Sequence, residues 1–434
     1  EFSTTQTYIL EFGDQYMRVY KDKGQVLSGG SPFEISTPFL EAELFDIKFA
    51  QSADVMYLCH PNHDVRKLSR TGHTSWTLAT VSFTGSPSLP ISGANNRPSC
   101  VSFFEQRLVF ANTITNPQTL WFSKAGDYEN FTTGTNADDA MIYTIASNQV
   151  NAIQYLKAVR TLVVGTSGGE FTVSADGTDA SITPTNVTIK RQSSFGSAGV
   201  DAIPAGNAVL FLQKAKRKIR ELAYNFDSDG YVAPDLTILN ESVTKSGVNQ
   251  MVYQQEPDSI IWCVRDDGEL AGLTYQRSEN VVAWHRHIFG GAFGNGIAVC
   301  ESAASISGVL TEDEFWVVVK RTINGATKRY VECFSNFDFD ETDATDFRFL
   351  DSHLSYSGSA TTTLSGLAHL EGQTVSILAD GSVHANKVVS SGQITLDRSV
   401  TKACVGLAYD SILQTMRVEG GAAEGTSQGK TKRI

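Results

Sequence analysis

The sequence contains few cysteines, and none of them lie close together. A zinc site requires close cysteine or histidine pairs, and a small disulfide-bonded scaffold requires a denser set, so neither is indicated. At least four of the cysteines lie in apolar, strand-like runs. We therefore expect buried free thiols, as in a protein that assembles in a reducing cytoplasm. The six are Cys59, Cys100, Cys263, Cys300, Cys333 and Cys404.

Long apolar runs and an excess of positive charge are also missing. No run approaches the roughly 20 residues needed to cross a bilayer, and no signal-peptide pattern opens the chain. The 434 residues include 35 Lys and Arg against 47 Asp and Glu, a formal net charge of −12. Because tight nucleic-acid binding recruits basic residues, this balance disfavours sequence-specific DNA binding. It suits a surface past which DNA slides without sticking.

Motifs for common enzyme chemistry are scarce. Neither a P-loop nor a dinucleotide-binding glycine pattern occurs, and the glycine-rich stretch Gly290–Gly296 fits neither spacing. We expect that stretch to be a tight connection between strands. No pair of carboxylates is marked out for glycoside hydrolysis. The sequence therefore predicts no enzyme activity, no catalytic residue, no metal and no cofactor.

What the chain does contain is the composition of an all-β protein. It has 36 glycines against 11 prolines, and short runs rich in Val, Thr, Tyr and Phe recur between turn signals. Hairpins return about every 40 to 50 residues, which is the period of four-stranded propeller blades. No sequence signature repeats, so sandwich and barrel assemblies share this rhythm. The prediction is an irregular β-propeller-like core with a small additional β domain at the carboxyl end.

Changes in residue composition and in predicted secondary structure along the chain indicate three parts. Residues 1–98 form a hairpin and helix block that ends in the Ser/Gly/Pro-rich stretch Val81–Pro98, and this block is a candidate for completing the propeller. Residues 99–335 form the propeller-like core. Residues 336–434 begin with an acidic segment and continue as a small β domain.

Local signals refine this outline. Gly168 and Gly169 are predicted to provide the positive φ angles of a tight primed turn, and Asn324 with Gly325 mark another turn. The one confident helix prediction is Pro38–Phe49, capped by Thr37.

Two histidine pairs are candidate metal ligands. His60 and His63 have an i, i+3 spacing, but Pro61 and Asn62 favour a turn, and no third ligand is evident. His285 and His287 alternate on a strand and point the same way, which favours a partly buried pair over a metal site.

Two charged runs, one acidic and one basic, are also candidate sites. The acidic run from Asp338 to Asp346 superficially resembles a calcium loop but lacks the glycine and the terminal glutamate of an EF-hand, so a solvated segment is the better interpretation. The basic run KAKRKIR is expected to form a hairpin turn and the strand after it. It is the candidate contact with a channel or with another subunit, through Lys214, Lys216, Arg217, Lys218 and Arg220.

The segment SRTGHTSW, Ser69–Trp76, resembles a degenerate Asp-box, a strand-turn-strand folding motif of sialidase-type propellers. Thr71 and His73 stand where that motif has Asp and Gly. Because an Asp-box is a folding motif, it supports a propeller without implying glycosidase activity.

The opening block YILEFGDQYMRVYKDKGQV, TPFLEAELFDIKFAQSADVMYLCHP and VRKLSRTGHTSW resembles the amino-terminal part of the tail tubular, or nozzle, proteins of short-tailed bacteriophages. QRLVFANTITNPQTLWFSKAGDYENF, SFGSAGVDAIPAGNAVLFLQ and LEGQTVSILADG extend the likeness over most of the chain. The resemblance implies a structural ring, usually of six copies, around the DNA exit channel of the virion tail, assembled in the host cytoplasm. Its implied roles are tail assembly, genome retention and ejection.

The partners that the resemblance implies are further copies of the chain, the adaptor and fibre proteins of the tail, and DNA that passes without sequence specificity. The chain has no initiator Met and ends on GKTKRI, so we expect both ends to be cut and the isolated chain to be a monomer. The alternative is a receptor- or glycan-binding propeller, with a glycoside hydrolase ranked below it. A glycan-binding propeller requires aromatic residues at one rim, for which the candidates are Trp121, Tyr128, Tyr143 and Trp284.

Overall fold

The computed structural model describes residues 6–85, 91–146, 150–177, 181–227, 229–308, 312–335 and 343–415. The chain divides into two compact units, 1–340 and 341–434. Each unit is described by itself. The described residues contain no helix long and apolar enough to span a membrane.

The described residues of unit 1 form seven antiparallel sheets of three or four strands that follow one another in chain order. Sheet 1 consists of β1 (Ile9–Gly13), β2 (Tyr16–Lys21), β3 (Gly24–Gln25) and β6 (Glu34–Ser36), with β3 and β6 both paired to β2. Sheet 2 consists of β7 (Lys48–Ser52), β8 (Val55–His60), β9 (His63–Gly72) and β10 (Ser75–Thr80). Sheet 3 consists of β11 (Cys100–Phe104), β12 (Arg107–Ala111), β13 (Thr119–Phe122) and β14 (Met141–Thr144).

Sheets 4 to 7 continue the same up-and-down pattern. Sheet 4 consists of β15 (Ile153–Ala158), β16 (Leu162–Thr166), β17 (Gly169–Ala175) and β18 (Val187–Ser193). Sheet 5 consists of β19 (Ile203–Ala205), β20 (Ala208–Leu212), β21 (Ile219–Asn225) and β22 (Gly230–Val232). Sheet 6 consists of β23 (Val248–Gln254), β24 (Ile260–Arg265), β25 (Leu270–Gln276) and β26 (Val281–His287). Sheet 7 has three strands in the described residues, β29 (Val299–Ile306), β30 (Glu314–Ile323) and β31 (Ala326–Cys333).

Short elements lie within or between these sheets. The ribbons are β4 (Leu27–Ser28) with β5 (Ser31–Pro32) and β27 (Ala292–Phe293) with β28 (Gly296–Ile297). The 3-10 helices are η1 (Glu41–Asp46) and η2 (Arg277–Glu279). Of these elements, η1 and the β27–β28 ribbon stand between consecutive sheets.

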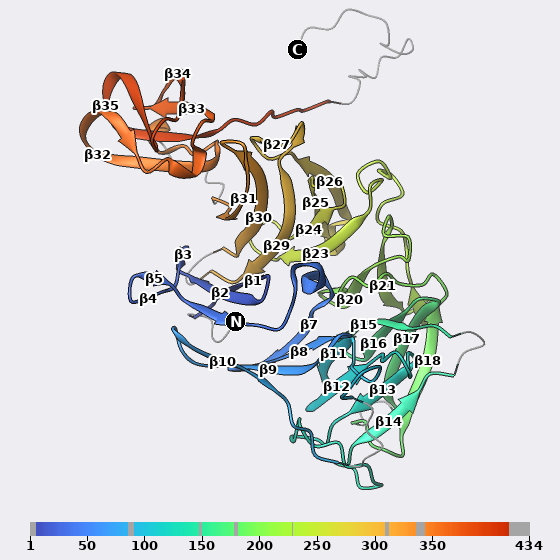
Figure 1. The fold of residues 1–434 in the computed structure, drawn as a ribbon. Coiled ribbons are helices and arrows are strands. Elements are labelled where there is room, and N and C mark those ends of the chain that lie inside the picture. The colour runs from blue at the N-terminus through green and yellow to red at the C-terminus, as the bar shows by residue number, and fades with distance from the viewer. Residues whose placement is uncertain are drawn as a thin grey trace, which may run out of the picture. The chain divides into compact units, whose positions relative to one another are not determined.

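The first strands of successive sheets contact one another, as the inner strands of propeller blades do. β11 contacts both β7 and β15, and β23 contacts both β19 and β29. In Figure 1 the sheets succeed one another around a centre, from the blue sheet 1 through green to the gold sheet 7. Unit 1 is therefore an irregular β-propeller, and its sheets start about 40 to 50 residues apart as the hairpin rhythm predicted.

The hydrophobic core of unit 1 is divided into six layers, each between two consecutive sheets. Tyr57 of sheet 2 shares a layer with Phe110 of sheet 3, and Leu210 of sheet 5 shares one with Ile261 of sheet 6. The other layers join sheets 1 and 2, 3 and 4, 4 and 5, and 6 and 7. Sheets 2 to 6 are thus buried on both faces, which explains the nearly continuous apolar runs of their inner strands.

A backbone hydrogen bond recurs at four of these junctions. The acceptor is a backbone carbonyl at the turn between the second and third strands of one sheet. The donor is the backbone amide of a residue at or shortly before the first strand of the next sheet. Repetition of this bond gives unit 1 a regular frame, although the residues that make it share no sequence pattern. The pairs are Pro117 O with Ile153 N (2.9 Å), Thr166 O with Ser197 N (2.8 Å), Lys216 O with Val248 N (2.9 Å) and Gly268 O with Cys300 N (2.9 Å).

Sheets 7 and 1 meet through fewer contacts. The ring of Tyr20 on β2 lies 6.1 Å from that of Trp316 on β30. Thr7 donates its hydroxyl to the Ser307 carbonyl at 3.3 Å, and Arg329 pairs with Glu41 at 2.8 Å. Among the described residues, no hydrophobic layer comparable with the other six fills this junction, which we call the seam.

Unit 2 contains one four-stranded sheet in the order β32 (Asp351–Ser365), β35 (Gln393–Leu407), β33 (Thr374–Ala379), β34 (Ser382–Val388). The 3-10 helices η3 (Ala344–Asp346) and η4 (Ala368–Leu370) complete it. The core gathers Leu, Ile and Val from β32, β33, β35 and η4, with Val389 just after β34. The sequence stretches QITLD and KACVGL both belong to one long strand, β35. Most of the stretch TMRVE lies outside the described residues.

The Pro38–Phe49 helix prediction is wrong in extent. Within this segment the structure has only the 3-10 helix η1, and Lys48 and Phe49 already belong to β7, where they pair with Cys59 and Leu58. Backbone pairing with β8 outweighs the weak helical preference of so short a segment. The Thr37 hydroxyl is buried without a hydrogen-bond partner and does not cap the helix.

Turn predictions had mixed outcomes. Asn324 and Gly325 have φ angles of 48° and 74° and join β30 to β31, as expected. Gly168 and Gly169 lie at the β16–β17 turn, but neither has a positive φ angle. Gly169 is needed for lack of space instead, because a Cβ on this residue would stand 2.5 Å from the Ser193 carbonyl oxygen.

The cysteines are all free, and five of the six are buried, as predicted.

Candidate functional site

The basic run predicted as a contact site forms the turn between β20 and β21 and the start of β21. Lys214 and Arg217 are exposed in this turn, and Lys216 bonds to the side chain of Asn249 at 2.9 Å. The turn therefore adjoins the first strand of sheet 6. It brings the five predicted residues to one region of unit 1.

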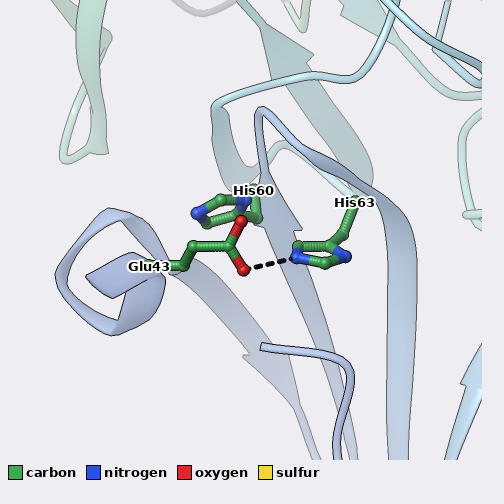
Figure 2. Close-up of side chains that lie close together, drawn as sticks. All are labelled: Glu43, His60 and His63. Atoms are coloured by element: carbon green, nitrogen blue, oxygen red, sulfur yellow. Dashed lines mark hydrogen bonds and ion pairs between the residues drawn. The ribbon is translucent and has the colours of Figure 1, made fainter. Parts of the chain in front are cut away.

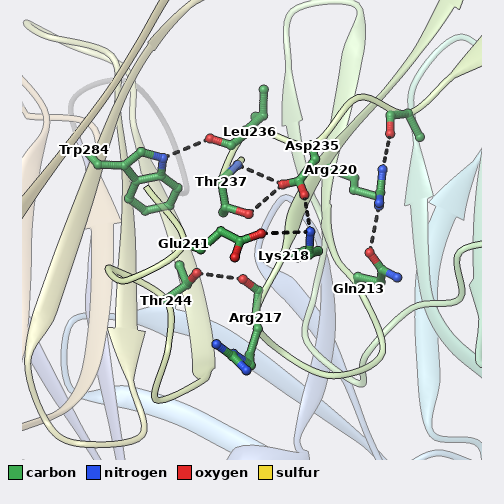
Figure 3. Close-up of polar contacts among 11 residues, drawn as sticks. Gln213, Arg217, Lys218, Arg220, Asp235, Leu236, Thr237, Glu241, Thr244 and Trp284 are labelled. Atoms are coloured by element: carbon green, nitrogen blue, oxygen red, sulfur yellow. Dashed lines mark hydrogen bonds and ion pairs between the residues drawn. The ribbon is translucent and has the colours of Figure 1, made fainter. Parts of the chain in front are cut away.

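Three of the five basic side chains have local partners: Lys216, bonded to Asn249, and Lys218 and Arg220 (Figure 3). The Lys218 ammonium pairs with Asp235 at 2.8 Å and with Glu241 at 3.3 Å. These hydrogen bonds raise the pKa of Lys218. Burial would raise the pKa of Asp235, but the bonds from Lys218 and Thr237 hold it below its usual range.

The Arg220 side chain also has partners within the fold. It donates to the Gln213 side chain at 2.8 Å and to the Ala233 carbonyl at 2.7 Å, and its guanidinium stacks 3.5 Å from the centre of the Phe195 ring. Lys218 and Arg220 thus hold sheet 5 together, whereas Lys214 and Arg217 carry the charge that faces solvent.

A small open pocket of about 270 Å³ lies beside this turn, lined by Gln213, Ala215, Arg217, Lys218 and Glu241. Its lining is mainly polar in residue type, with charges of both signs. It contains no paired carboxylates and no nucleophile–base pair, so the pocket offers no arrangement for bond cleavage.

The aromatic residues considered for a glycan-binding rim are engaged within the fold. Trp121 is buried in the layer between sheets 2 and 3, and Tyr128 packs against Phe103 with ring centres 4.9 Å apart. Tyr143 and Trp284 are half-buried and donate hydrogen bonds to backbone carbonyls, at 2.7 Å and 3.0 Å. These four residues do not form an exposed stacking platform.

Glu43 joins His60 and His63 in a polar cluster (Figure 2). Glu43 belongs to η1, His60 ends β8 and His63 begins β9, so the hairpin places the two imidazoles next to the helix. The Glu43 carboxylate lies 2.7 Å from His63 Nε2 and accepts from Asn62 Nδ2 at 3.0 Å and from the Leu40 amide at 3.1 Å. The hydrogen bond with His63 is the main cause that lowers the pKa of Glu43 to about 2.

Sequence reasoning missed Glu43 because it is 17 residues from His60, in a segment predicted as a longer helix. The expected turn at Pro61 and Asn62 is present between β8 and β9. Phe39 packs edge-on against His63 at 5.1 Å and shields the cluster on one side.

The other histidine pair behaves as predicted. His285 and His287 are half-buried on β26, with Nδ1 and Nε2 2.7 Å apart, and both rings lie against Trp262. Burial lowers the pKa of both, that of His287 to about 4. Among the described residues no third metal ligand joins them.

The remaining motifs are structural. Ser69–Trp76 is the β9–β10 hairpin, in which Trp76 Nε1 donates to the His73 carbonyl at 3.0 Å. Gly290–Gly296 includes the small β27–β28 turn. Asp338 lies outside the described residues, whereas Asp346 pairs with Lys402 at 2.7 Å.

One further spacing, G-x-S-x-G at Gly165–Gly169, is that of a hydrolase nucleophile elbow. The elbow requires a strand followed by a helix, and here Ser167 lies in a turn between the antiparallel strands β16 and β17. The motif therefore has no catalytic context.

No family model and no curated protein matches the chain. Among solved structures, the chain is similar to YCF48 bound to D1 peptide (12% identity, TM-score 0.39, covering 77% of this chain and 94% of that one). It is also similar to the Pan2 WD40 domain of Neurospora crassa (8%, 0.42, 78% and 88%). A third is the Cps50 (Swd1) β-propeller domain of Myceliophteria thermophila (8%, 0.41, 76% and 99%). Similarities this distant carry no argument about function, and the description of unit 1 as a propeller rests on its own sheets.

Proposed function

We propose that this chain is a structural subunit of a bacteriophage tail nozzle, in which copies form a ring around the channel for DNA. Six copies is the ring size that the resemblance implies. The net charge of −12 supports the proposal, because a channel wall that repels phosphates lets DNA slide.

The observation on which the proposal rests is the use of the segments that resemble the nozzle family. In Gln106–Phe131, the buried Arg107 donates to the carbonyls of Ser123 (2.7 Å), Asp139 (2.8 Å) and Ala137 (2.6 Å). In Ser194–Gln213, Ser197 donates to the buried Glu170 at 2.8 Å across sheets 4 and 5. Polar residues in these segments maintain the frame, which is what a structural subunit requires.

The exposed basic residues Lys214 and Arg217 fit the same proposal. Two uncompensated charges per copy, repeated around a ring, would touch passing phosphates weakly and without sequence preference. The same residues would serve equally for contact with a neighbouring copy. A ring of one chain requires heterologous contacts, in which two different surfaces of each copy meet.

The proposal is tested with a phage that carries an amber codon in the gene for this chain. In a non-suppressing host we expect filled heads that lack complete tails and lose DNA, and a suppressor should restore infectivity. Particles with complete tails and normal infectivity in the absence of the protein would refute the structural role. A glycan array with matched hydrolysis assays tests the receptor-binding and hydrolase alternatives, and we expect neither binding nor cleavage.

A further inference from the structure

We propose that Glu43, His60 and His63 form a binding site for a divalent transition-metal ion, with Zn²⁺ as the best match. One ligand atom from each residue lies within 4.8 Å of the others, and this is the one such group of three found in the described residues. Two imidazoles and one carboxylate form a donor set that Zn²⁺ accepts readily.

The separations suit coordination after small side-chain movements. Ligand atoms about 2 Å from a tetrahedral zinc ion lie about 3.3 Å from one another. The Glu43 Oε2 to His63 Nε2 distance of 2.7 Å must open slightly, and separations of up to 4.8 Å must close. Figure 2 shows the Glu43 carboxylate directed toward the two histidine rings, which come from the two ends of one hairpin turn.

His60 is the residue whose present bonding is incomplete. It is 1% exposed, its Nδ1 accepts the Asn62 amide at 3.0 Å, and its Nε2 has no hydrogen-bond partner. Accepting at Nδ1 places the proton of a neutral ring on Nε2, so a buried N–H is left unsatisfied, which costs free energy. Binding the ion at Nε2 removes this cost: the ring proton moves to Nδ1, and the Asn62 amide gives up its bond to that atom.

The proton on His63 can move so that this side chain offers a lone pair to the ion. His63 shares a proton with Glu43 through Nε2, and moving that proton to Nδ1 frees the Nε2 lone pair for the ion. The Glu43 carboxylate, like glutamates in general, is ionised at neutral pH. The ion thus replaces a hydrogen bond between two groups that are both good metal ligands.

Surrounding groups would orient the ligands and leave room for water. Asn62 Nδ2 donates to Glu43 Oε1 at 3.0 Å, which holds the carboxylate in place while Oε2 coordinates. The side chains of Glu43 and His63 remain 16% and 20% accessible. Solvent can therefore supply the fourth ligand.

The position of the site gives it a structural consequence. η1 follows sheet 1, whereas His60 and His63 belong to sheet 2, so a bound ion ties the helix after one sheet to the hairpin of the next. η1 also provides Glu41, which pairs with Arg329 across the seam. Metal binding is therefore expected to stabilise this part of the ring.

Titration of the purified, metal-free chain with Zn²⁺ by calorimetry, and with Co²⁺ by absorption, tests the site. We expect one ion per chain, Co²⁺ bands typical of four-coordination, and a rise in melting temperature on adding Zn²⁺. Glu43→Gln and His63→Gln should each weaken Zn²⁺ binding at least tenfold. Both substitutions preserve side-chain size, and circular dichroism establishes that each variant is folded.

His285→Gln is the matched control, because it removes a half-buried histidine from the other pair. This variant should bind Zn²⁺ as tightly as the parent chain. Absence of stoichiometric binding, equal affinity in Glu43→Gln, or loss of binding in His285→Gln would each overturn the assignment. If His63→Gln does not fold, Glu43→Gln alone decides between these outcomes.

Discussion

At the scale of single residues, unit 1 uses buried charge to hold irregular backbone. Arg107 is 2% exposed and forms no ion pair within the described residues; its guanidinium instead satisfies backbone carbonyls that precede β14 and one that follows β13. Burial lowers the pKa of its guanidinium, but an arginine remains charged at any ordinary pH. Arginine suits this role because its planar fork donates in several directions at once.

Arg107→Met is expected to destabilise the chain by about 3 kcal/mol, because it leaves buried carbonyls without donors. Chemical denaturation followed by tryptophan fluorescence measures the change. Arg286→Met serves as the control, since this half-exposed side chain has one distant ion pair at 3.5 Å, and its loss should cost no more than about 0.5 kcal/mol. Equal destabilisation by the two substitutions would contradict the role assigned to Arg107.

Glu170 provides a prediction about pH. The side chain is fully buried, and burial raises its pKa, although Ser193 and Ser197 donate to the carboxylate. A raised pKa in the folded state means that the folded chain binds this proton more tightly, so stability falls as pH rises from about 4.5 through the folded pKa. Glu170→Gln removes the titration and should gain stability relative to the parent chain over that range.

Melting temperatures of both proteins between pH 4.5 and 8 test this. The difference between them should shift in favour of Glu170→Gln as pH rises. A constant difference would show that Glu170 does not titrate in this range.

At the scale of elements, turns require glycine for two separate reasons, which are backbone conformation and lack of space for a side chain. Gly325 meets a demand of backbone conformation, with φ at 74°, whereas Gly169 meets one of space. Sequence patterns predicted the first correctly because Asn-Gly has its own turn preference. They misjudged the second because the crowding atom belongs to Ser193, at the far end of the following strand β18 and 24 residues from Gly169.

Gly169→Ala is expected to destabilise sheet 4 by about 1 to 3 kcal/mol, because backbone must move to admit the new methyl group. Gly24→Ala is the control, since a Cβ there would lie 3.8 Å from the Lys21 carbonyl oxygen, an ordinary contact. Denaturation midpoints of the two variants measure the difference, and a Gly169→Ala variant as stable as the parent would exclude the close approach.

The same distinction explains what the sequence could reveal about the sites. The hairpin rhythm and the location of the basic run were predictable because strands and turns are encoded locally. The pairing of Lys218 with Glu241 and the approach of Glu43 to His63 were not, because tertiary packing brings these residues together. The extent of the short helix η1 was not predictable either, since pairing between β7 and β8 determined where it ends.

At the scale of the whole molecule, the seam between sheets 7 and 1 is where the ring of sheets is held least by apolar packing. Its main aromatic contact joins Tyr20 and Trp316. Trp316→Ala should increase amide hydrogen exchange in both β30 and β2, which are about 300 residues apart in the chain.

Trp284→Ala is the control for this experiment, because Trp284 is half-buried and packs within the layer between sheets 5 and 6. It should raise exchange there and leave β2 unaffected. If Trp316→Ala leaves β2 protected as in the parent chain, the contacts across the seam do not close the ring.

The account as a whole depends on the location of the protein in a phage particle. The most direct measurement is a cryo-electron microscopy reconstruction of the intact virion, with the full-length protein identified by fitting units 1 and 2. The account predicts a ring of copies, six by resemblance, below the portal and around the DNA channel. Absence of the protein from the particle, or its presence only at a fibre tip, would contradict it.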